Sequence, residues 1–171
     1  MNSRIMVSFE HVSKAFPGVK ALDDVSFNIV ESEVHAIVGE NGAGKSTLLN
    51  ILHGVYTEYD GVIKIGSNQV KFRSTQDALQ GGIAKVHQEV SLITELSVGQ
   101  NITLGYEPRK GPFIDYKLLH EKANAILKRL GCKFSSEDNV KTLSVGEMQM
   151  IAIAKALFHD AKVISLDEPT A

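Results

Sequence analysis

Residues 39–47 read Gly-Glu-Asn-Gly-Ala-Gly-Lys-Ser-Thr and match the phosphate-loop pattern G-x-x-x-x-G-K-S/T. Glycines in such a loop let the backbone curl, so that successive N–H groups point at one anion. A helix that follows the loop aims the positive end of its dipole at the same anion. Lys45 would supply a point charge to the β- and γ-phosphates, and the Ser46 hydroxyl could take one position on Mg²⁺. The loop therefore predicts binding of a nucleoside triphosphate.

The alternative to a phosphate loop is a glycine turn that matches the pattern by chance. An apolar segment before the loop and a helical pattern after it favour the phosphate loop. Gly42 and Gly44 do not form a dinucleotide fingerprint, because the third glycine of that motif is missing. The candidate nucleotide-binding residues of the loop are Gly39, Asn41, Gly42, Gly44, Lys45, Ser46 and Thr47.

Two carboxylates, Asp167 and Glu168, follow the apolar run 163–166 near the C-terminus. Parallel α/β sheets place ligand chemistry at the carboxyl ends of their strands. Asp167 would then hold Mg²⁺, largely through water, and Glu168 would act as the general base on an attacking water. The alternative is a charged loop after a strand, but the phosphate loop upstream favours the catalytic interpretation.

Residues 143–149 place Ser144 and Gly146 at the start of a predicted helix. Ser144 and Glu147 match a capping box, which satisfies the N–H groups at a helix start and would by itself explain both residues. The same serine hydroxyl, a glycine N–H and the helix dipole can also form an anion site. Both interpretations stay open from the residues alone.

The elements around these motifs predict an α/β fold. Alternating apolar residues predict strands over 5–10 and 25–30, and short apolar runs predict buried strands over 34–38, 83–86 and 163–166. A hairpin is predicted from 62–65 and 70–72, and a helix over 45–53 that ends at Gly54.

From residue 92 onward the pattern becomes helical. Asp115 is predicted to cap a helix that ends at Gly131, and 148–158 is apolar almost all round, which predicts a buried helix. Residues 105–115 carry two prolines and two glycines and predict a surface loop.

Composition narrows the class of protein. The 171 residues allow one domain, and a net charge of −2 without any tryptophan gives no support for nucleic-acid binding. The single cysteine, Cys132, excludes an internal disulfide and a cysteine-based zinc site. No apolar run is long enough for a membrane span, and no signal core follows Arg4, so secretion is not expected.

Taken together, the motifs resemble the nucleotide-binding domain of an ATP-binding cassette (ABC) transporter. The residues that carry the resemblance are the loop 39–47, Gln88, the segment 143–147 and the end 163–171, in the order and spacing of the family. Residues 16–22, 87–89 and 143–146 look most like the first of two cassettes in the simple-sugar importers of bacteria.

The resemblance implies roles for further residues. Phe16 would stack on adenine, although a buried phenylalanine at a strand end is the alternative. Gln88 would ligate Mg²⁺ with Ser46 and Asp167, and it would lie in the loop that faces the membrane subunit. Ser144 and Gly146 would act on ATP held by a partner cassette. Residues 1–88 and 160–171 would form a P-loop NTPase core with an N-terminal antiparallel β region, and residues 89–159 the helical insertion.

The sequence departs from the family pattern at two places. The usual Leu-Ser-Gly-Gly-Gln has Val145 and Glu147 in place of a glycine and the glutamine, and Glu147 puts a carboxylate near the incoming phosphate. The family also continues beyond Glu168 with a loop that crosses the dimer and a histidine on the γ-phosphate. All six histidines of this chain precede Glu168, so the domain is expected to be incomplete at its C-terminus.

The implied function is Mg²⁺-dependent ATP hydrolysis that powers import of a small solute, a sugar. The implied partners are transmembrane permease subunits, a second cassette in the same chain or in a dimer partner, and indirectly a solute-binding protein, but no nucleic acid. The implied location is peripheral, on the cytoplasmic face of the inner membrane. The alternatives are a soluble ABC ATPase outside transport, and a nucleotide-binding fragment without turnover.

Overall fold

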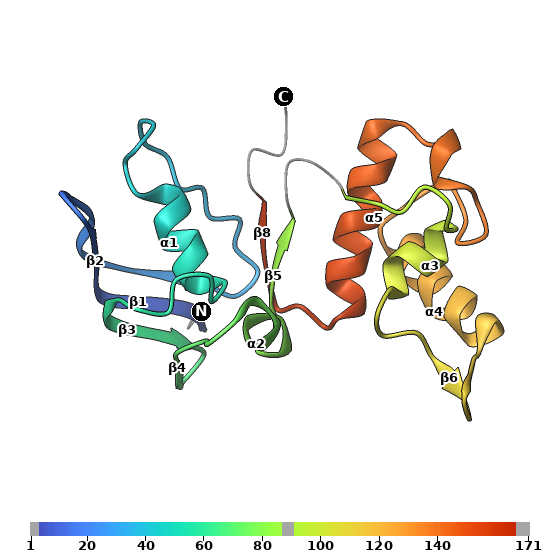
Figure 1. The fold of residues 1–171 in the computed structure, drawn as a ribbon, viewed down its shortest axis with the longest axis horizontal. Helices are drawn as coiled ribbons and strands as arrows, with labels where there is room; N and C mark the ends of the chain where they lie inside the picture. The colour runs from blue at the N-terminus through green and yellow to red at the C-terminus, as the bar shows by residue number, and fades with distance from the viewer. Residues whose placement is uncertain (1–3, 87–90, 167–171) are drawn as a thin grey trace. The chain divides into compact units, whose positions relative to one another are not determined.

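The N-terminal half of the chain folds around two long antiparallel strands, β1 (Ile5–Phe16) and β2 (Val19–Val30) (Figure 1). The computed structural model describes residues 4–86 and 91–166. The chain divides into two units, Met1–Ile83 and Ala84–Ala171.

The first unit contains a four-stranded antiparallel sheet in the order β2-β1-β3-β4, completed by β3 (Asp60–Ile65) and β4 (Asn68–Val70). The predicted hairpin is therefore confirmed, with a two-residue turn at which Gly66 has a φ of 60°. Such a positive φ is the reason for a glycine there. The fully buried side chains of the sheet are Val7, Phe9, Val12 and Ile63.

The strands predicted over 5–10 and 25–30 are present, and both extend further than predicted. His11 and Asp24 each have a φ of 54° and lie where the register of the two strands shifts, with His11 Nδ1 2.7 Å from Asp24 Oδ1. The His11 N–H donates to Ser26 Oγ (2.8 Å), and the Asp24 N–H donates to Ser13 Oγ (2.9 Å). These bulges interrupt the alternation of apolar and polar residues, so the sequence pattern stops before the strands do.

Helix α1 (Lys45–Leu52) packs against β2 and buries Leu48, Ile51 and Leu52. It ends as predicted, at His53 followed by Gly54 with a φ of 68°. The loop before α1 lies directly on β2, because a Cβ added to Gly44 would be 2.3 Å from the carbonyl oxygen of Ala21. The unit also contains the short helix α2 (Thr75–Gln80).

The buried strand predicted over 34–38 is wrong. Residues 33–40 have no regular secondary structure, and Val34 and Val38 are 100% and 90% exposed. An apolar run becomes a strand only where a neighbouring strand accepts its hydrogen bonds, and none of the described strands pairs with this segment. A run of apolar residues indicates that a segment could form a buried strand, but it does not show that a neighbouring strand is present to pair with it.

The two remaining predicted strands are present as β5 (Ile83–Val86) and β8 (Val163–Leu166), which pair with each other. β8 is less buried than predicted, and Leu166 is 45% exposed. Among the described strands, β5 is its one neighbour, so one edge of β8 lacks a partner there.

Three helices form the core of the second unit, α3 (Val98–Thr103), α4 (Tyr116–Arg129) and α5 (Val145–Phe158), and each packs against the other two (Figure 1). A short 3-10 helix, η1 (Val140–Thr142), lies between α4 and α5 in the chain. The buried cluster consists of Val98, Ile102, Ala123, Leu127, Val140, Ile151 and Ala154. Within residues 4–86 and 91–166, every helix is too short or too polar to cross a lipid bilayer.

The local signals for these helices are confirmed in part. The Asp115 carboxylate accepts the N–H of Leu118 (3.0 Å) at the start of α4, and Gly131 follows its end with a φ of 71°. The predicted surface loop contains a hairpin of two very short strands, β6 (Arg109–Lys110) and β7 (Phe113–Ile114), both exposed. Helix α5 is only partly buried: Ile151, Ala154 and Ala156 are buried, and its other residues are half-buried or exposed.

Substituting Gly44 by Ala is expected to destabilise the first unit more than substituting Gly18 by Ala. Both glycines have a positive φ, which costs a side chain about 1–2 kcal/mol. Only Gly44 would also press its Cβ into the backbone of β2, which adds about 1–3 kcal/mol. Urea unfolding of the two variants measures the difference, and equal losses would contradict the contact at Ala21.

Substituting the fully buried Ile151 by Ala is expected to lower the free energy of unfolding by about 2–5 kcal/mol, because it opens a cavity among α3, α4 and α5. Phe113, which is 76% exposed, is the control, and its change to Ala should alter stability by less than about 0.5 kcal/mol. Similar losses for the two variants in denaturant titrations would show that this cluster does not hold the helices together.

Candidate functional site

The backbone of the phosphate loop adopts the conformation that its glycines permit. Gly42 and Gly44 have φ values of 85° and 88°, in the left-handed region that favours glycine. The Ala43 N–H donates to the Glu40 carbonyl oxygen (3.1 Å) and tightens the turn. Gly39 lies close beneath it, because a Cβ there would be 3.2 Å from the Cβ of Ala43. The predicted glycines thus serve a tight loop at the start of α1.

Lys45 folds back across this loop. Its Nζ donates to the carbonyl oxygens of Gly39 (2.6 Å) and Glu40 (2.8 Å). An ammonium group has three donors, and among the described residues two of them hold the loop, which leaves the third for an incoming oxygen. The arrangement places a positive charge over the loop before any ligand is bound.

The N-terminus of α1 differs from those of the other described α-helices. In α2, α3, α4 and α5 the side chain of the N-cap residue accepts a backbone N–H of the first turn. These N-cap residues are Ser74, Ser97, Asp115 and Ser144 respectively. At α1 the N-cap is Gly44, no side chain caps the turn, and no acidic residue lies in it. Within the part of the chain that the structure describes, no N-cap side chain takes the first N–H groups of α1, so these groups and the positive end of the dipole can receive an external anion.

The polar residues of the loop lie where a phosphate or cation could reach them. Asn41 and Ser46 are exposed, and Thr47 is half-buried in the first turn of α1. The described part of the chain contains no group of three His, Cys, Asp or Glu side chains that could hold a metal ion. Gln88, Asp167 and Glu168 lie outside the described residues, so their roles as metal ligands and general base stay predictions.

Phe16 lies half-buried at the end of β1. The Tyr56 ring meets it edge to face at a centroid distance of 5.3 Å, and Lys14 Nζ lies 5.3 Å from its centroid. The strand that pairs with Phe16 continues to Ala21, which touches the loop at Gly44. Sequence reasoning missed Tyr56 and Lys14, because no spacing links them to Phe16. Stacking of Phe16 on adenine stays a prediction.

The start of α5 is a complete capping box, as predicted. The Glu147 N–H donates to Ser144 Oγ (3.4 Å), and the Ser144 N–H donates to Glu147 Oε2 (2.9 Å). The Ser144 hydroxyl also donates to Glu147 Oε2 (2.7 Å). These bonds, first the backbone N–H and then the hydroxyl, lower the pKa of Glu147. Gly146 is exposed and Val145 is 75% exposed, so the segment is open to solvent, and anion binding there stays a prediction.

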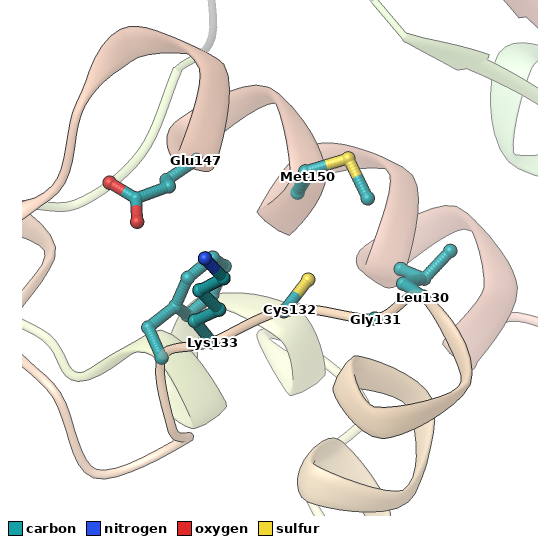
Figure 2. A pocket seen from close by; sticks show the side chains of 7 residues that line it. Leu130, Gly131, Cys132, Lys133, Glu147 and Met150 are labelled. Carbon is teal, nitrogen blue, oxygen red and sulfur yellow. The ribbon is translucent and has the colours of Figure 1, made fainter.

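A pocket of about 240 Å³ lies beside this capping box. Glu147 and Met150 project from α5 on one side, and the segment after α4 forms the other side (Figure 2). Its lining residues are Leu130, Gly131, Cys132, Lys133, Phe134, Glu147 and Met150. Burial, and then the charge of Glu147, raises the pKa of the Cys132 thiol, so it stays protonated near neutral pH and is no activated nucleophile.

The sequence is similar to those of known proteins. A model of the ABC transporter family matches residues 22–171. The xylose import ATP-binding protein XylG of Geobacillus kaustophilus is 44% identical over 168 residues, which are 97% of this chain and 33% of that protein. A putative ribose/galactose/methyl galactoside import ATP-binding protein of Burkholderia ambifaria is 46% identical over 168 residues, 98% of this chain and 32% of that protein.

The fold is shared as well. The structure of cbiO1 from Clostridium perfringens, part of the ABC transporter complex cbiONQ, matches with a TM-score of 0.82 and 29% identity, over 98% of this chain and 67% of that one. The chain spans about a third of the length of the curated relatives above. Since the family model covers most of the chain and the phosphate loop and capped helix start lie within that match, the chain belongs to the ABC transporter family.

Proposed function

We propose that this chain is an ATP-binding cassette that binds ATP with Mg²⁺ and, within its whole protein, hydrolyses ATP to power import of a sugar. The observation that carries ATP binding is the open N-terminus of α1 beneath the Lys45 ammonium. In four described helices the N-cap side chain accepts one first-turn N–H, and in the helix after the phosphate loop no N-cap side chain does. A bound phosphate chain completes that turn with the strong acceptors it lacks.

Lys45 and the loop would position the phosphates. The third donor of the Lys45 ammonium would reach the β- and γ-phosphates while the other two keep the carbonyls of Gly39 and Glu40 in place. The exposed Ser46 hydroxyl in the first turn of α1 suits a hard cation, which takes oxygen ligands. Mg²⁺, when bound, would neutralise charge between the β- and γ-phosphates.

The catalytic assignments rest on sequence motifs. Glu168 would accept a proton from the attacking water, and Asp167 and Gln88 would hold the cation with Ser46. Ser144 and Gly146 would contact ATP held by a second cassette, in the same chain or in a partner. Residues 1–88 and 160–171 would make the nucleotide-binding core with its β region, and residues 89–159 the helical insertion that meets the permease.

The substrate class and location follow from the relatives. Import proteins for xylose and for ribose or galactose resemble almost all of this chain, which supports a sugar importer. The cassette would then work with transmembrane permease subunits, and indirectly with a solute-binding protein. Its place would be peripheral, on the cytoplasmic face of the inner membrane.

Changing Lys45 to Ala is expected to lower ATP affinity tenfold or more, because the charge at the β- and γ-phosphates is lost. Equilibrium titration with a fluorescent ATP analogue, competed by ATP at physiological salt, measures the affinity. Lys117→Ala removes an exposed lysine of α4, in the second unit, and should leave affinity unchanged. An affinity of Lys45→Ala within about twofold of the parent protein would refute ATP binding by this loop.

In the full-length protein, Glu168→Gln is expected to keep ATP affinity within about twofold and to slow hydrolysis by about 10²–10⁴-fold. The amide keeps the shape of the side chain and cannot accept the proton of the attacking water. Single-turnover phosphate release is the measurement, with Glu121→Gln on α4 as the control carboxylate. Near-parental hydrolysis by Glu168→Gln would remove Glu168 from the role of general base.

A further inference from the structure

The capping box of α5 uses the serine hydroxyl in a way that capping alone does not need. The capping bonds themselves are Glu147 N–H to Ser144 Oγ and Ser144 N–H to Glu147 Oε2. In addition, the Ser144 O–H donates to the same Oε2 at 2.7 Å. A hydroxyl has one proton to donate, so Ser144 has already given it to a side chain of its own helix.

The chain contains a second capping box that shows the difference. At the start of α3, the Ser97 N–H donates to Gln100 Oε1 (2.9 Å) and the Gln100 N–H donates to Ser97 Oγ (3.3 Å). Between these two described residues there is no bond from the Ser97 hydroxyl to Gln100. A glutamine thus makes both capping bonds with its serine. The additional bond from the serine hydroxyl is found only in the box that has the carboxylate of Glu147.

That third bond has a consequence for an approaching phosphate. A hydrogen bond from a hydroxyl to a carboxylate is stronger than one between neutral groups, so the proton of Ser144 is held firmly. The carboxylate also lies at the positive end of the α5 dipole, which stabilises its negative charge. An external anion bound there would otherwise receive the same stabilisation. Lys133 lines the same pocket as Glu147, but these two described residues form no ion pair, so the Glu147 carboxylate keeps its negative charge without a cationic partner at Lys133.

We propose that Glu147 is a built-in competitor that weakens the docking of an ATP phosphate at Ser144 and Gly146. This inference rests on the proposed function, in which these residues meet ATP held by a second cassette. Glu147 is a positioning residue here, because it acts by taking the proton of Ser144 and by adding a negative charge where the phosphate arrives.

The test is Glu147→Gln in the full-length protein, with the ATP concentration at half-maximal hydrolysis as readout. Glutamine keeps both capping bonds, as Gln100 does in α3, so the thermal midpoint should stay within about 2 °C. It frees the Ser144 proton and removes one negative charge near the phosphate. The half-saturating ATP concentration is expected to fall about tenfold.

Two further variants separate this effect from a general change of the helix. In Ser144→Ala the hydroxyl is absent. Adding Glu147→Gln to that variant should therefore lower the half-saturating ATP concentration by a smaller factor than it does in the parent protein. Gln100→Glu makes the opposite exchange in the box of α3 and should leave half-saturation unchanged. Glu147→Ala also removes the charge but loses one capping bond, so it should lower half-saturation and the thermal midpoint together.

The results distinguish this inference from the proposed function. If Lys45→Ala abolishes ATP binding and Glu147→Gln leaves half-saturation unchanged or raises it, the competitor role is overturned and ATP binding by the loop stands. A full gain for Glu147→Gln in the Ser144→Ala background would also overturn the role assigned to the Ser144 proton. If Lys45→Ala binds ATP normally, the proposed function itself fails.

Discussion

The first N–H groups of a helix need acceptors, and this requirement organises the candidate site. Four described α-helices meet it with a serine or aspartate at the N-cap, whereas α1 begins at Gly44 without a side-chain acceptor. Something other than a cap must therefore hold the start of α1. The structure supplies the close approach of Gly44 to the Ala21 backbone and the two bonds from the Lys45 side chain to the loop carbonyls. The long hairpin of β1 and β2 supports the first contact and also carries Phe16.

Local chemistry explains which elements could be predicted from the sequence. The caps at Asp115 and Ser144, the helix ends at Gly54 and Gly131, and the hairpin at Gly66 each depend on residues a few positions apart. The segment 34–38 depends on a partner strand from elsewhere in the chain, which no local pattern contains. The bulges at His11 and Asp24 had the reverse effect: they interrupt the alternation of apolar and polar residues, so the pattern did not predict the last six residues of β1.

At the candidate site, too, only the features that depend on neighbouring residues in the sequence could be predicted. The residue types of the loop and of the capping box follow from their motifs, and the structure places them at the starts of α1 and α5. The hydrogen-bond partners of the side chains do not follow from the motifs, because they depend on the rotamers that the side chains adopt. No pattern predicts that Lys45 bonds to Gly39 and Glu40, that Tyr56 meets Phe16 edge-on, or that the Ser144 proton goes to Glu147. Asp167, Glu168 and Gln88 are assigned by motif alone.

The two capping boxes of the second unit differ by one side-chain atom, a carboxylate oxygen in Glu147 and an amide nitrogen in Gln100. Glutamate and glutamine codons differ only in their first base. One point mutation in the gene therefore changes the charge at the start of α5 without altering its length, its cap or its packed face. Descendants of this gene can strengthen or weaken that helix start in a single inherited step, while the fold that presents it stays intact.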